Sequence, residues 1–448
     1  MSRLAPGRGL VAFMLVASVA IPVGSRVRAV ADPTALVGIL ADVAVDPPSV
    51  GFGAQAPGTG ARTPYVVTNL ADSGSGSLRA ALALARANGS GDITFEIPGG
   101  GGTLSSNTSL SIPPNTTIEG PTSSPGITID GRNITHNGVL NVYASGVVIR
   151  NLRIRNAGLA QLQPGQQSAD GIQIMPKRVC GSGSSAGNPC NSNTQCGPMS
   201  LCLQGSNISD VWIDHVSVTN SADEGIEVAG CVNLTGTTGC DPNSTWIASN
   251  VTISNSYVAG NGTCPLALCP TCTSCGGAST GSGGGSLLKY GATRVSVFGN
   301  FWDKNYRRNP RLEATCPLGS NAADCALVDI RSNLITAPQA DDWVVVSGTL
   351  AKGNVVGNYF EGSGAQDYVG IASGPNAGQF FASLNSDPTQ TSIRSTSGIT
   401  APFPVPEVPP LSRDEVFSNA GALPRDGLDA YDTTAADYST VHSTLQLP

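Results

Sequence analysis

Charged side chains are scarce in this 448-residue chain: Lys and Arg number 24, Asp and Glu number 31, and together they make up 12% of the sequence. A typical soluble domain carries about 25%. Histidine occurs only 3 times, and no Ser–His–Asp spacing suits nucleophilic acyl chemistry. The formal net charge of −7 argues against a partner bound by overall positive charge, so we expect no nucleic-acid partner.

Glycine, by contrast, is abundant, with 55 residues. This is nearly twice the usual share of about 7%. Hydrophobic residues make up 40% of the chain, which excludes a disordered polyelectrolyte. Long helical patterns are few, which argues against helical bundles and coiled coils.

The N-terminus has the pattern of a signal peptide. Arg3 and Arg8 precede an apolar run over 10–19 that is too short to span a bilayer, and 29–31 read Ala-Val-Ala, a small-x-small cleavage site. The alternative is an N-terminal membrane anchor. We expect a signal peptide over 1–31, a Gly-, Pro- and Ala-rich linker over 32–62, and a secreted chain that is free of the membrane once the signal is removed.

The 12 cysteines fall into even local groups, which in an exported chain predict loops stapled by disulfides. Each group of four allows three pairings, and all remain open. A metal site is the alternative at Cys269-x-x-Cys272-x-x-Cys275. The groups are Cys180, Cys190, Cys196 and Cys202; Cys231 and Cys240; Cys264, Cys269, Cys272 and Cys275; and Cys316 and Cys325.

One helix is predicted, with Ser77 as its N-cap and Gly89 at its C-terminal cap. After it, short β patterns repeat a phrase of alternating apolar residues followed by a small or polar residue. Asn300, Asn333 and Asn358 each follow an apolar residue of such a phrase by three positions. The repetition predicts an all-β solenoid in which asparagines stack at a left-handed bend. A two-sheet sandwich is the alternative. The helix, whose apolar face is Leu78, Ala81, Leu82 and Ala85, would cap the open end.

Three acids, Asp170, Asp223 and Glu227, lie in or next to predicted strands. The offset of four between Asp223 and Glu227 would direct both to one face of a single strand, and Asp170 would reach that face from the coil before. Oxygen ligands from adjacent coils suit a hard cation, calcium above magnesium. Solvated acids on an outer face are the alternative.

Basic residues concentrate in the segment 289–311 of this acidic chain, which contains a single acid, Asp303. The patch suits a polyanion, above all carboxylates, which Arg binds through two hydrogen bonds. A solvated run of charge is the alternative. Its members are Lys289, Arg294, Lys304, Arg307, Arg308 and Arg311.

Several motifs together resemble the pectate lyases, extracellular enzymes built on a right-handed parallel β-helix. The resemblance covers about residues 65–360, with a further match near the C-terminus, and it implies a β-helical domain over 63–375 and a C-terminal tail over 376–448. The matching segments are Val67–Arg79, Asp170–Ile172, Val211–His215, Asp223–Val228, Val251–Tyr257, Val295–Trp302, Arg308–Arg311 and Pro424–Asp429.

The resemblance also implies roles for individual residues. Asp170, Asp223 and Glu227 match the calcium ligands of the family, and Arg308 matches the arginine that takes the proton. Lys289 lies near the substrate-binding lysine, although the strictly aligned position holds Ser286.

The position of the family's second arginine holds Glu313, and Arg311 lies two residues earlier. We therefore expect Lys289, Arg307 and Arg311 to bind substrate. The predicted function is β-elimination of polygalacturonate or a related acidic polysaccharide by a calcium-dependent monomer. The alternatives are a glycan-binding β-helix without activity, and a hydrolase of the polygalacturonase type that uses two acids.

Overall fold

The computed structural model describes residues 50–56, 62–123, 125–159, 169–183, 185–198, 200–232, 240, 245–262, 283–313, 327–336, 344–346, 351–361, 369–371, 379–383, 385, 402–406, 408 and 410–421. The chain divides into two units, 1–46 and 47–448, and all described residues belong to the second. The expected signal peptide and most of the expected linker therefore lie outside the described residues. In the described part of the chain, no helix has the length and apolar character that a membrane crossing requires.

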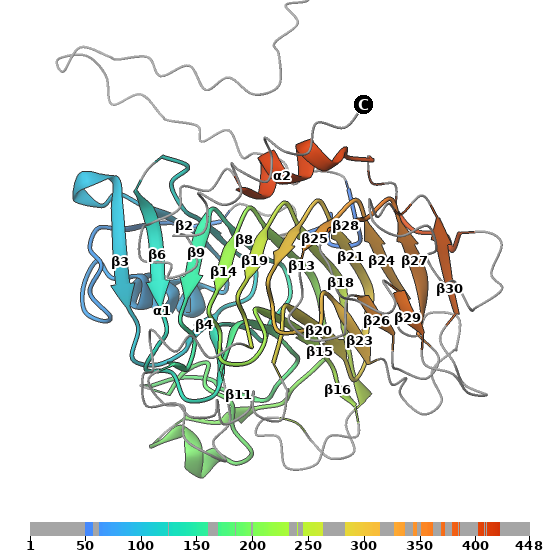
Figure 1. Ribbon diagram of the computed structural model, residues 1–448. Helices are drawn as coiled ribbons and strands as arrows, with labels where there is room; N and C mark the ends of the chain where they lie inside the picture. Colours follow the sequence, from blue (N-terminus) through green and yellow to red (C-terminus); the bar gives the residue numbers. More distant parts are fainter. Residues whose placement is uncertain are drawn as a thin grey trace, which may run out of the picture. The chain divides into compact units, whose positions relative to one another are not determined.

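Three parallel sheets make up the second unit (Figure 1). The ten-stranded sheet, here called sheet A, has the order β1 (Pro64–Val67), β2 (Gly91–Phe95), β5 (Thr116–Glu119), β8 (Val147–Arg150), β13 (Ile208–Asp214), β18 (Ala248–Ser254), β21 (Ala292–Phe298), β24 (Leu327–Arg331), β27 (Lys352–Val356) and β30 (Gln379–Ser383). Sheet B has the order β3 (Gly101–Ser105), β6 (Gly126–Asp130), β9 (Leu152–Arg155), β14 (Ser217–Thr219), β19 (Tyr257–Ala259), β22 (Phe301–Asp303), β25 (Leu334–Thr336) and β28 (Tyr359–Glu361). Sheet C has the order β4 (Leu110–Ile112), β7 (Asn137–Val142), β10 (Ala169–Ile174), β15 (Ile226–Ala229), β20 (Ser286–Lys289), β23 (Arg311–Glu313), β26 (Val344–Val346) and β29 (Val369–Ile371).

The chain visits the three sheets in turn, so that each coil adds one strand to sheets C, A and B. This is a parallel β-helix, and it confirms the predicted solenoid. The strand register stacks like residues of successive coils, as in the row Val147, Val211, Val251, Val295 and Val328. Each of these valines is at most 2% exposed. The apolar core is thus a set of rows that run along the axis, which is why the sequence repeats its apolar phrase.

The predicted helix is α1 (Leu78–Asn88), and it has the expected caps. The side chain of Ser77 accepts a hydrogen bond from the amide of Ala80, and Gly89 adopts the left-handed conformation with φ 76°. Its buried face packs against β1, β2 and β4 at the first coils. The capping role is therefore confirmed, and the buried residues are the predicted Leu78, Ala81, Leu82 and Ala85.

A buried asparagine ladder lines the bend between sheets A and B. The Nδ2 of Asn300 donates to Asn333 Oδ1 (3.1 Å), and Asn333 donates likewise to Asn358 (2.9 Å). The predicted stacking is confirmed. The predicted left-handed conformation is confirmed for Asn151 (φ 55°) and Asn255 (φ 47°), but it is wrong in the ladder of Asn300, Asn333 and Asn358. The left-handed residues are the preceding ones, including Gly299 (φ 66°) and Ser332 (φ 51°). The bend is made before the asparagine, whose side chain is then free to reach along the axis.

Both terminal segments of the unit contact the outside of the coils. Near the start, the amide of Phe52 donates to Ser296 Oγ at 3.0 Å. Near the end, Phe403 exchanges two backbone hydrogen bonds with the side chain of Asn354, and α2 (Arg413–Gly421) packs on sheet B beside β22 and β25. β30 lies beyond residue 375, the expected end of the β-helical domain, because Gln379–Ser383 pairs with β27.

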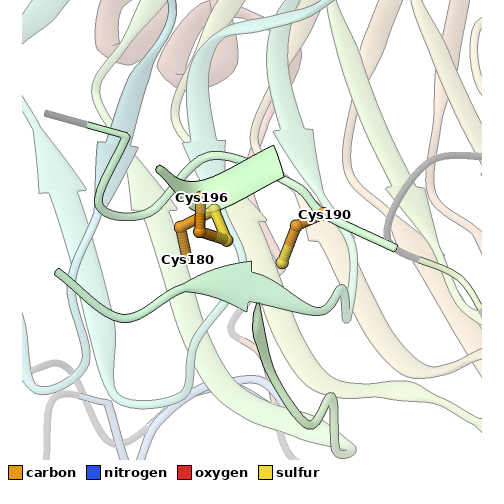
Figure 2. Close-up of side chains that lie close together, drawn as sticks. All are labelled: Cys180, Cys190 and Cys196. Carbon is orange, nitrogen blue, oxygen red and sulfur yellow. A yellow bond between two sulfur atoms is a disulfide. The ribbon is translucent and has the colours of Figure 1, made fainter. Parts of the chain in front are cut away.

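Disulfides staple the insertions, as predicted for the cysteines that the structure describes. The four-cysteine group pairs as Cys180–Cys196 and Cys190–Cys202, and Figure 2 shows three of these side chains in one buried cluster. This cluster closes the hairpin of β11 (Val179–Cys180) and β12 (Cys202–Leu203) around the 3-10 turn Asn193–Cys196. The third disulfide is Cys231–Cys240, beside the pair β16 (Cys231–Val232) and β17 (Thr245–Trp246). A second 3-10 turn spans Pro98–Gly100. The Cys264–Cys275 group and Cys316 and Cys325 lie outside the described residues.

Candidate active site

Three acids meet at the amino-terminal ends of neighbouring strands of sheet C. Asp170 lies at the start of β10, and Asp223 and Glu224 lie just before β15. One carboxylate oxygen from each residue lies within 4.8 Å of the other two. Asp170 and Glu224 are only 4% and 2% exposed, so the group is set into the protein rather than spread over its surface.

The register of sheet C explains why these acids converge. The phrase acid-Gly-Ile occurs at 170–172 and again at 224–226, and Ile172 pairs with Ile226. The amide of Gly171 donates to the carbonyl oxygen of Glu224 at 2.9 Å, which aligns the two phrases. Parallel strands lie about 4.8 Å apart, so residues at equivalent places in adjacent coils must be neighbours.

The alternation argument for Asp223 and Glu227 does not hold, because the two residues do not share a strand. β15 begins at Ile226, so Asp223 lies in the turn ahead of it. Only Glu227 has its direction set by the pleat, and its register partners on the same face of sheet C are Gln173 and Leu287.

Glu227 is held by two neighbours instead of standing free. Lys289 Nζ lies 2.7 Å from Glu227 Oε1, and Gln173 Nε2 donates to Glu227 Oε2 at 2.9 Å. Lys289 therefore lies with the acids on sheet C. Ser286, from the same strand, is fully buried, and its hydroxyl lies 3.4 Å from Trp302 Nε1.

The predicted arginines, Arg307, Arg308 and Arg311, lie one coil beyond Lys289, at the start of β23 and just before it. Arg308 pairs with Glu224, and Arg311 Nε lies 2.8 Å from Glu313 Oε1. Arg307 is half-buried, and its carbonyl oxygen accepts from the amide of Gly285 at 2.8 Å. This close approach requires glycine next to it: a Cβ added to Gly284 would lie 1.9 Å from the Arg307 carbonyl oxygen.

A second asparagine ladder ends beside Arg308. Asn261 Nδ2 donates to Asn305 Oδ1 (2.9 Å), and Asn305 Nδ2 donates to Asn309 Oδ1 (2.9 Å). All three are at most 1% exposed. Arg308 has a left-handed backbone with φ 63°, which a bulky residue adopts only when its surroundings enforce it. The ladder fixes the residue that follows Arg308 and supplies part of that constraint.

The electrostatics of the group follow from burial and crowding. Burial, then the negative charges of Glu227 and Asp223, raise the pKa of Asp170 well above its usual range. Burial also acts to raise the pKa of Glu227, but the charge and hydrogen bond of Lys289 outweigh it and hold that pKa below the usual range. Burial lowers the pKa of Arg308.

The donor set suits a hard divalent cation. Its three acids offer only oxygen, their oxygens lie close enough to bind one ion together, and a cation there would relieve the repulsion that raises the pKa of Asp170. Calcium accepts such carboxylate ligands in flexible geometry. Glu224 takes part, although it is not among the predicted ligands. The repeated acid-Gly-Ile phrase is the signal that identifies it.

Sequence reasoning missed three further residues beside the acids. Gln173 lies between Asp170 and Glu227, and Lys177 Nζ donates to Gln173 Oε1 at 3.0 Å. The Tyr143 hydroxyl donates to the same oxygen at 3.3 Å. Burial lowers the pKa of Lys177 to about 8. Gln173 shares its phrase position with Glu227, whereas nothing in the sequence places Lys177 or Tyr143 here.

Comparison with curated proteins gives two relatives with the same name. The chain is 28% identical over 275 residues to a probable pectate lyase C of Emericella nidulans, covering 61% of this chain and 46% of that protein. It is 27% identical over 321 residues to a probable pectate lyase C of Aspergillus terreus, covering 70% of this chain and 53% of that protein. The chain thus spans about half the length of the curated relatives it matches. No family model matches the chain.

Comparison with solved structures gives partial matches at low sequence identity. A Bacillus subtilis pectate lyase variant has a TM-score of 0.47 at 13% identity, covering 83% of this chain and 95% of that one. The cedar pollen allergen jun a 1 has a TM-score of 0.45 at 14% identity, covering 84% and 92%. At these scores the strand register, and not the superposition, establishes the β-helix. The curated relatives confirm the resemblance that the sequence motifs predict.

Proposed function

We propose that this relative of the pectate lyases is a secreted, calcium-dependent lyase that cleaves pectate or a related uronate polymer by β-elimination. The observation that carries the proposal is the meeting of Asp170, Asp223 and Glu224 with the cations Lys289 and Arg308 on one side of sheet C. A site for an acidic sugar needs both parts. The acids would hold a cation, which would supply positive charge for the substrate carboxylate, and the basic side chains would bind the remaining negative charge.

Asp170, Asp223 and Glu224 would hold the calcium ion. When bound, calcium would draw electron density from the uronate carboxylate and so acidify the proton on the adjacent carbon. Glu227 is the family-matched ligand, but among the described acids it is Asp170, Asp223 and Glu224 whose carboxylate oxygens lie within 4.8 Å of one another, while Glu227 forms an ion pair with Lys289. We therefore assign Glu227 to the positioning of Lys289 and make Glu224 the third ligand.

The substrate would be bound by Lys289, Arg307 and Arg311 through its carboxylates. Lys289 is held by Glu227 with 22% of its side chain exposed, and Arg311 has 23% exposed. Glu313 pairs with Arg311 and offsets part of its charge. We expect Arg311 to bind a uronate less tightly than an unpaired arginine would, because the incoming carboxylate must compete with Glu313.

In the elimination, the carbon next to the carboxylate loses its proton and the carbon–oxygen bond to the next sugar breaks. A double bond forms between the carbon that loses the proton and the neighbouring carbon that loses the glycosidic oxygen. The departing oxygen takes up a proton. Arg308 would act at the first of these events. An arginine side chain stays protonated in proteins, so we assign Arg308 to stabilise the negative charge that develops on the substrate. Hydroxide from solvent then accepts the proton.

Two features support a location outside the cell. The described cysteines all form disulfides, which persist in oxidising compartments. A uronate polymer is too large to cross a cell membrane unaided, so we expect an enzyme that cleaves it to act outside the cell. Export through the signal peptide expected over 1–31 is part of the proposal.

The test is an absorbance assay for the conjugated double bond, with polygalacturonate as substrate and with calcium either added or chelated. We expect absorbance to rise only with calcium. Arg308→Lys should lower kcat by about 100-fold, because a lysine keeps one charge but loses the planar donor geometry. The matched control is Arg294→Lys on sheet A, where Arg294 Nε donates to Asn250 Oδ1 (2.7 Å) and the guanidinium lies 4.9 Å from the centre of the Phe52 ring, whereas the acids lie on sheet C. It should leave kcat unchanged.

The alternatives give different results in the same assay. New reducing ends without absorbance would indicate a hydrolase, and uronate binding without any product would indicate a glycan-binding protein. Full turnover by Arg308→Lys would remove Arg308 from the mechanism.

A further inference from the structure

Among the described residues, Gln173 is the one uncharged side chain that joins Asp170 of the cation site to Glu227. Its Nε2 donates to Asp170 Oδ2 (3.2 Å) and to Glu227 Oε2 (2.9 Å). It is 7% exposed and is the register partner of Glu227 in the next coil. The two acids repel each other, and the shared donor holds one oxygen of each at a fixed distance from the other.

This arrangement works only if the amide faces the acids with its nitrogen. A reversed amide would turn its oxygen toward two carboxylates, which is repulsive. The orientation is set on the other side of the amide, where the Lys177 ammonium (3.0 Å) and the Tyr143 hydroxyl (3.3 Å) both donate to Oε1. An ammonium group cannot accept a hydrogen bond, so it admits only the oxygen.

Lys177 is itself held in place for this contact. Its Nζ donates to Asn137 Oδ1 at 2.9 Å and lies 5.1 Å from the centre of the Tyr143 ring, and the residue is 5% exposed. Among the described residues, no carboxylate lies within ion-pair distance of Lys177. A buried lysine without a direct acidic partner is costly, and the contact with Gln173 gives it a role.

We propose that Lys177 and Gln173 form a positioning relay for the cation site: Lys177 orients the amide of Gln173, and that amide holds the Asp170 carboxylate in place for calcium by tying it to Glu227. The inference rests on the calcium site of the proposed function. Neither residue touches the substrate, so both are positioning residues. The partners behind metal ligands typically contribute about 10- to 100-fold to metal affinity.

The sign of the effect separates this relay from simple electrostatics. The positive charge of Lys177 repels a divalent cation, so its removal alone should tighten calcium binding. The relay predicts the opposite. Lys177→Met leaves the Gln173 amide free to turn, and the acids lose their common donor. Calcium binding should then weaken although a repelling charge has gone.

The experiment is a calorimetric titration of the full-length protein with calcium alone, without substrate. Lys177→Met and Gln173→Leu should each weaken calcium binding by about 10-fold or more. Because both residues act through the same contact, the double variant should bind calcium within about twofold of the more impaired single variant. The matched control is Arg178→Met, which removes a charge one residue away, where the guanidinium lies 6.0 Å from the Trp246 ring. It should not weaken binding.

Tyr143→Phe is a milder second variant that keeps the packing and removes only one donor. It should weaken calcium binding a few-fold, with an unchanged melting temperature in the presence of chelator. Tighter or unchanged binding in folded Lys177→Met, or losses that add in the double variant, would overturn the relay. A wild type that binds no calcium would overturn the relay together with the site. A wild type that binds calcium but forms no unsaturated product would remove the proposed lyase activity and leave the relay standing.

Discussion

The two asparagine ladders allow a matched test of whether the scaffold positions Arg308. Asn305 and Asn333 are both fully buried, and the side chain of each makes four hydrogen bonds. In each case the side-chain oxygen accepts two hydrogen bonds and the side-chain nitrogen donates two. The donor–acceptor distances are 2.8–3.1 Å for Asn305 and 2.9–3.1 Å for Asn333. They differ in what they adjoin, because only the ladder of Asn305 reaches Asn309, next to Arg308.

Replacement of either asparagine by alanine should destabilise the protein by a similar amount. A buried hydrogen bond contributes about 1 kcal/mol net, so four of them amount to about 4 kcal/mol. Such a loss lies within the total stability of about 5–15 kcal/mol that proteins typically have, so the variants should still fold. Urea unfolding followed by circular dichroism measures the free energy of unfolding. Asn133→Ala, at an exposed residue with one hydrogen bond to Asn107, is the control and should cost less than about 1 kcal/mol.

The catalytic consequences should differ although the stability losses agree. Asn305→Ala releases Asn309 and with it the left-handed backbone at Arg308, and a displacement of about 1 Å at a reacting group can cost about 100-fold in rate. We therefore expect kcat to fall by about 10- to 100-fold in Asn305→Ala and by less than twofold in Asn333→Ala. Equal kcat values in the two variants would show that the ladder supports the fold without positioning Arg308.

Two further predictions concern the acids. Glu224→Gln should weaken calcium binding by at least about 10-fold, because it removes a charged ligand. Glu227→Gln should mainly raise KM, because it releases Lys289. If calorimetric titration shows the same loss of calcium affinity in both variants, Glu227 is a ligand as well. At Asp214, burial acts to raise the pKa, but hydrogen bonds from His215, Ser254 and Asn255 outweigh it and hold the pKa below its usual value. A lowered folded-state pKa stabilises the fold above the unfolded value of about 3.9, and this stabilisation is lost as the pH falls through the folded value. Asp214→Asn should therefore lower the melting temperature at pH 6–7 and approach the wild type below about pH 4; a difference that does not change with pH would show that the charge of Asp214 is irrelevant.

Much of the fold could be predicted because it depends on short sequence patterns, which recur from one coil to the next. The caps at Ser77 and Gly89 each depend on a few adjacent residues, and the stacked valines recur in the successive strands β8, β13, β18, β21 and β24 of sheet A. The left-handed bend falls on the predicted asparagine at Asn151 and Asn255, but one residue earlier at Asn300 and Asn333. Asparagine favours that conformation in general, but at Asn300 and Asn333 the side chain is needed for the ladder, and the preceding Gly299 and Ser332 make the bend.

The candidate site was harder to predict because it depends on register rather than on neighbours in sequence. The acids Asp170 and Asp223 were identified by their resemblance to family ligands. Glu224 could have been found from the repeated acid-Gly-Ile phrase, which shows which residues occupy equivalent places in adjacent coils. Lys177 could not, because it follows β10 and reaches Gln173 through a turn whose path no local pattern specifies.

The geometry of a β-helix makes such a site possible and also makes it costly. Coils about 4.8 Å apart place equivalent residues in contact, so an acid-containing phrase repeated in two coils necessarily brings carboxylates together. Lys289 offsets this repulsion at Glu227, and Arg308 offsets it at Glu224, each from a later coil. The same cations that suit an acidic polymer therefore also stabilise the empty cluster of acids. It follows that Lys289→Met should lower both substrate affinity and the stability of the calcium-free protein, and that calcium should restore part of the lost stability, because the bound ion takes over the neutralisation of the acids.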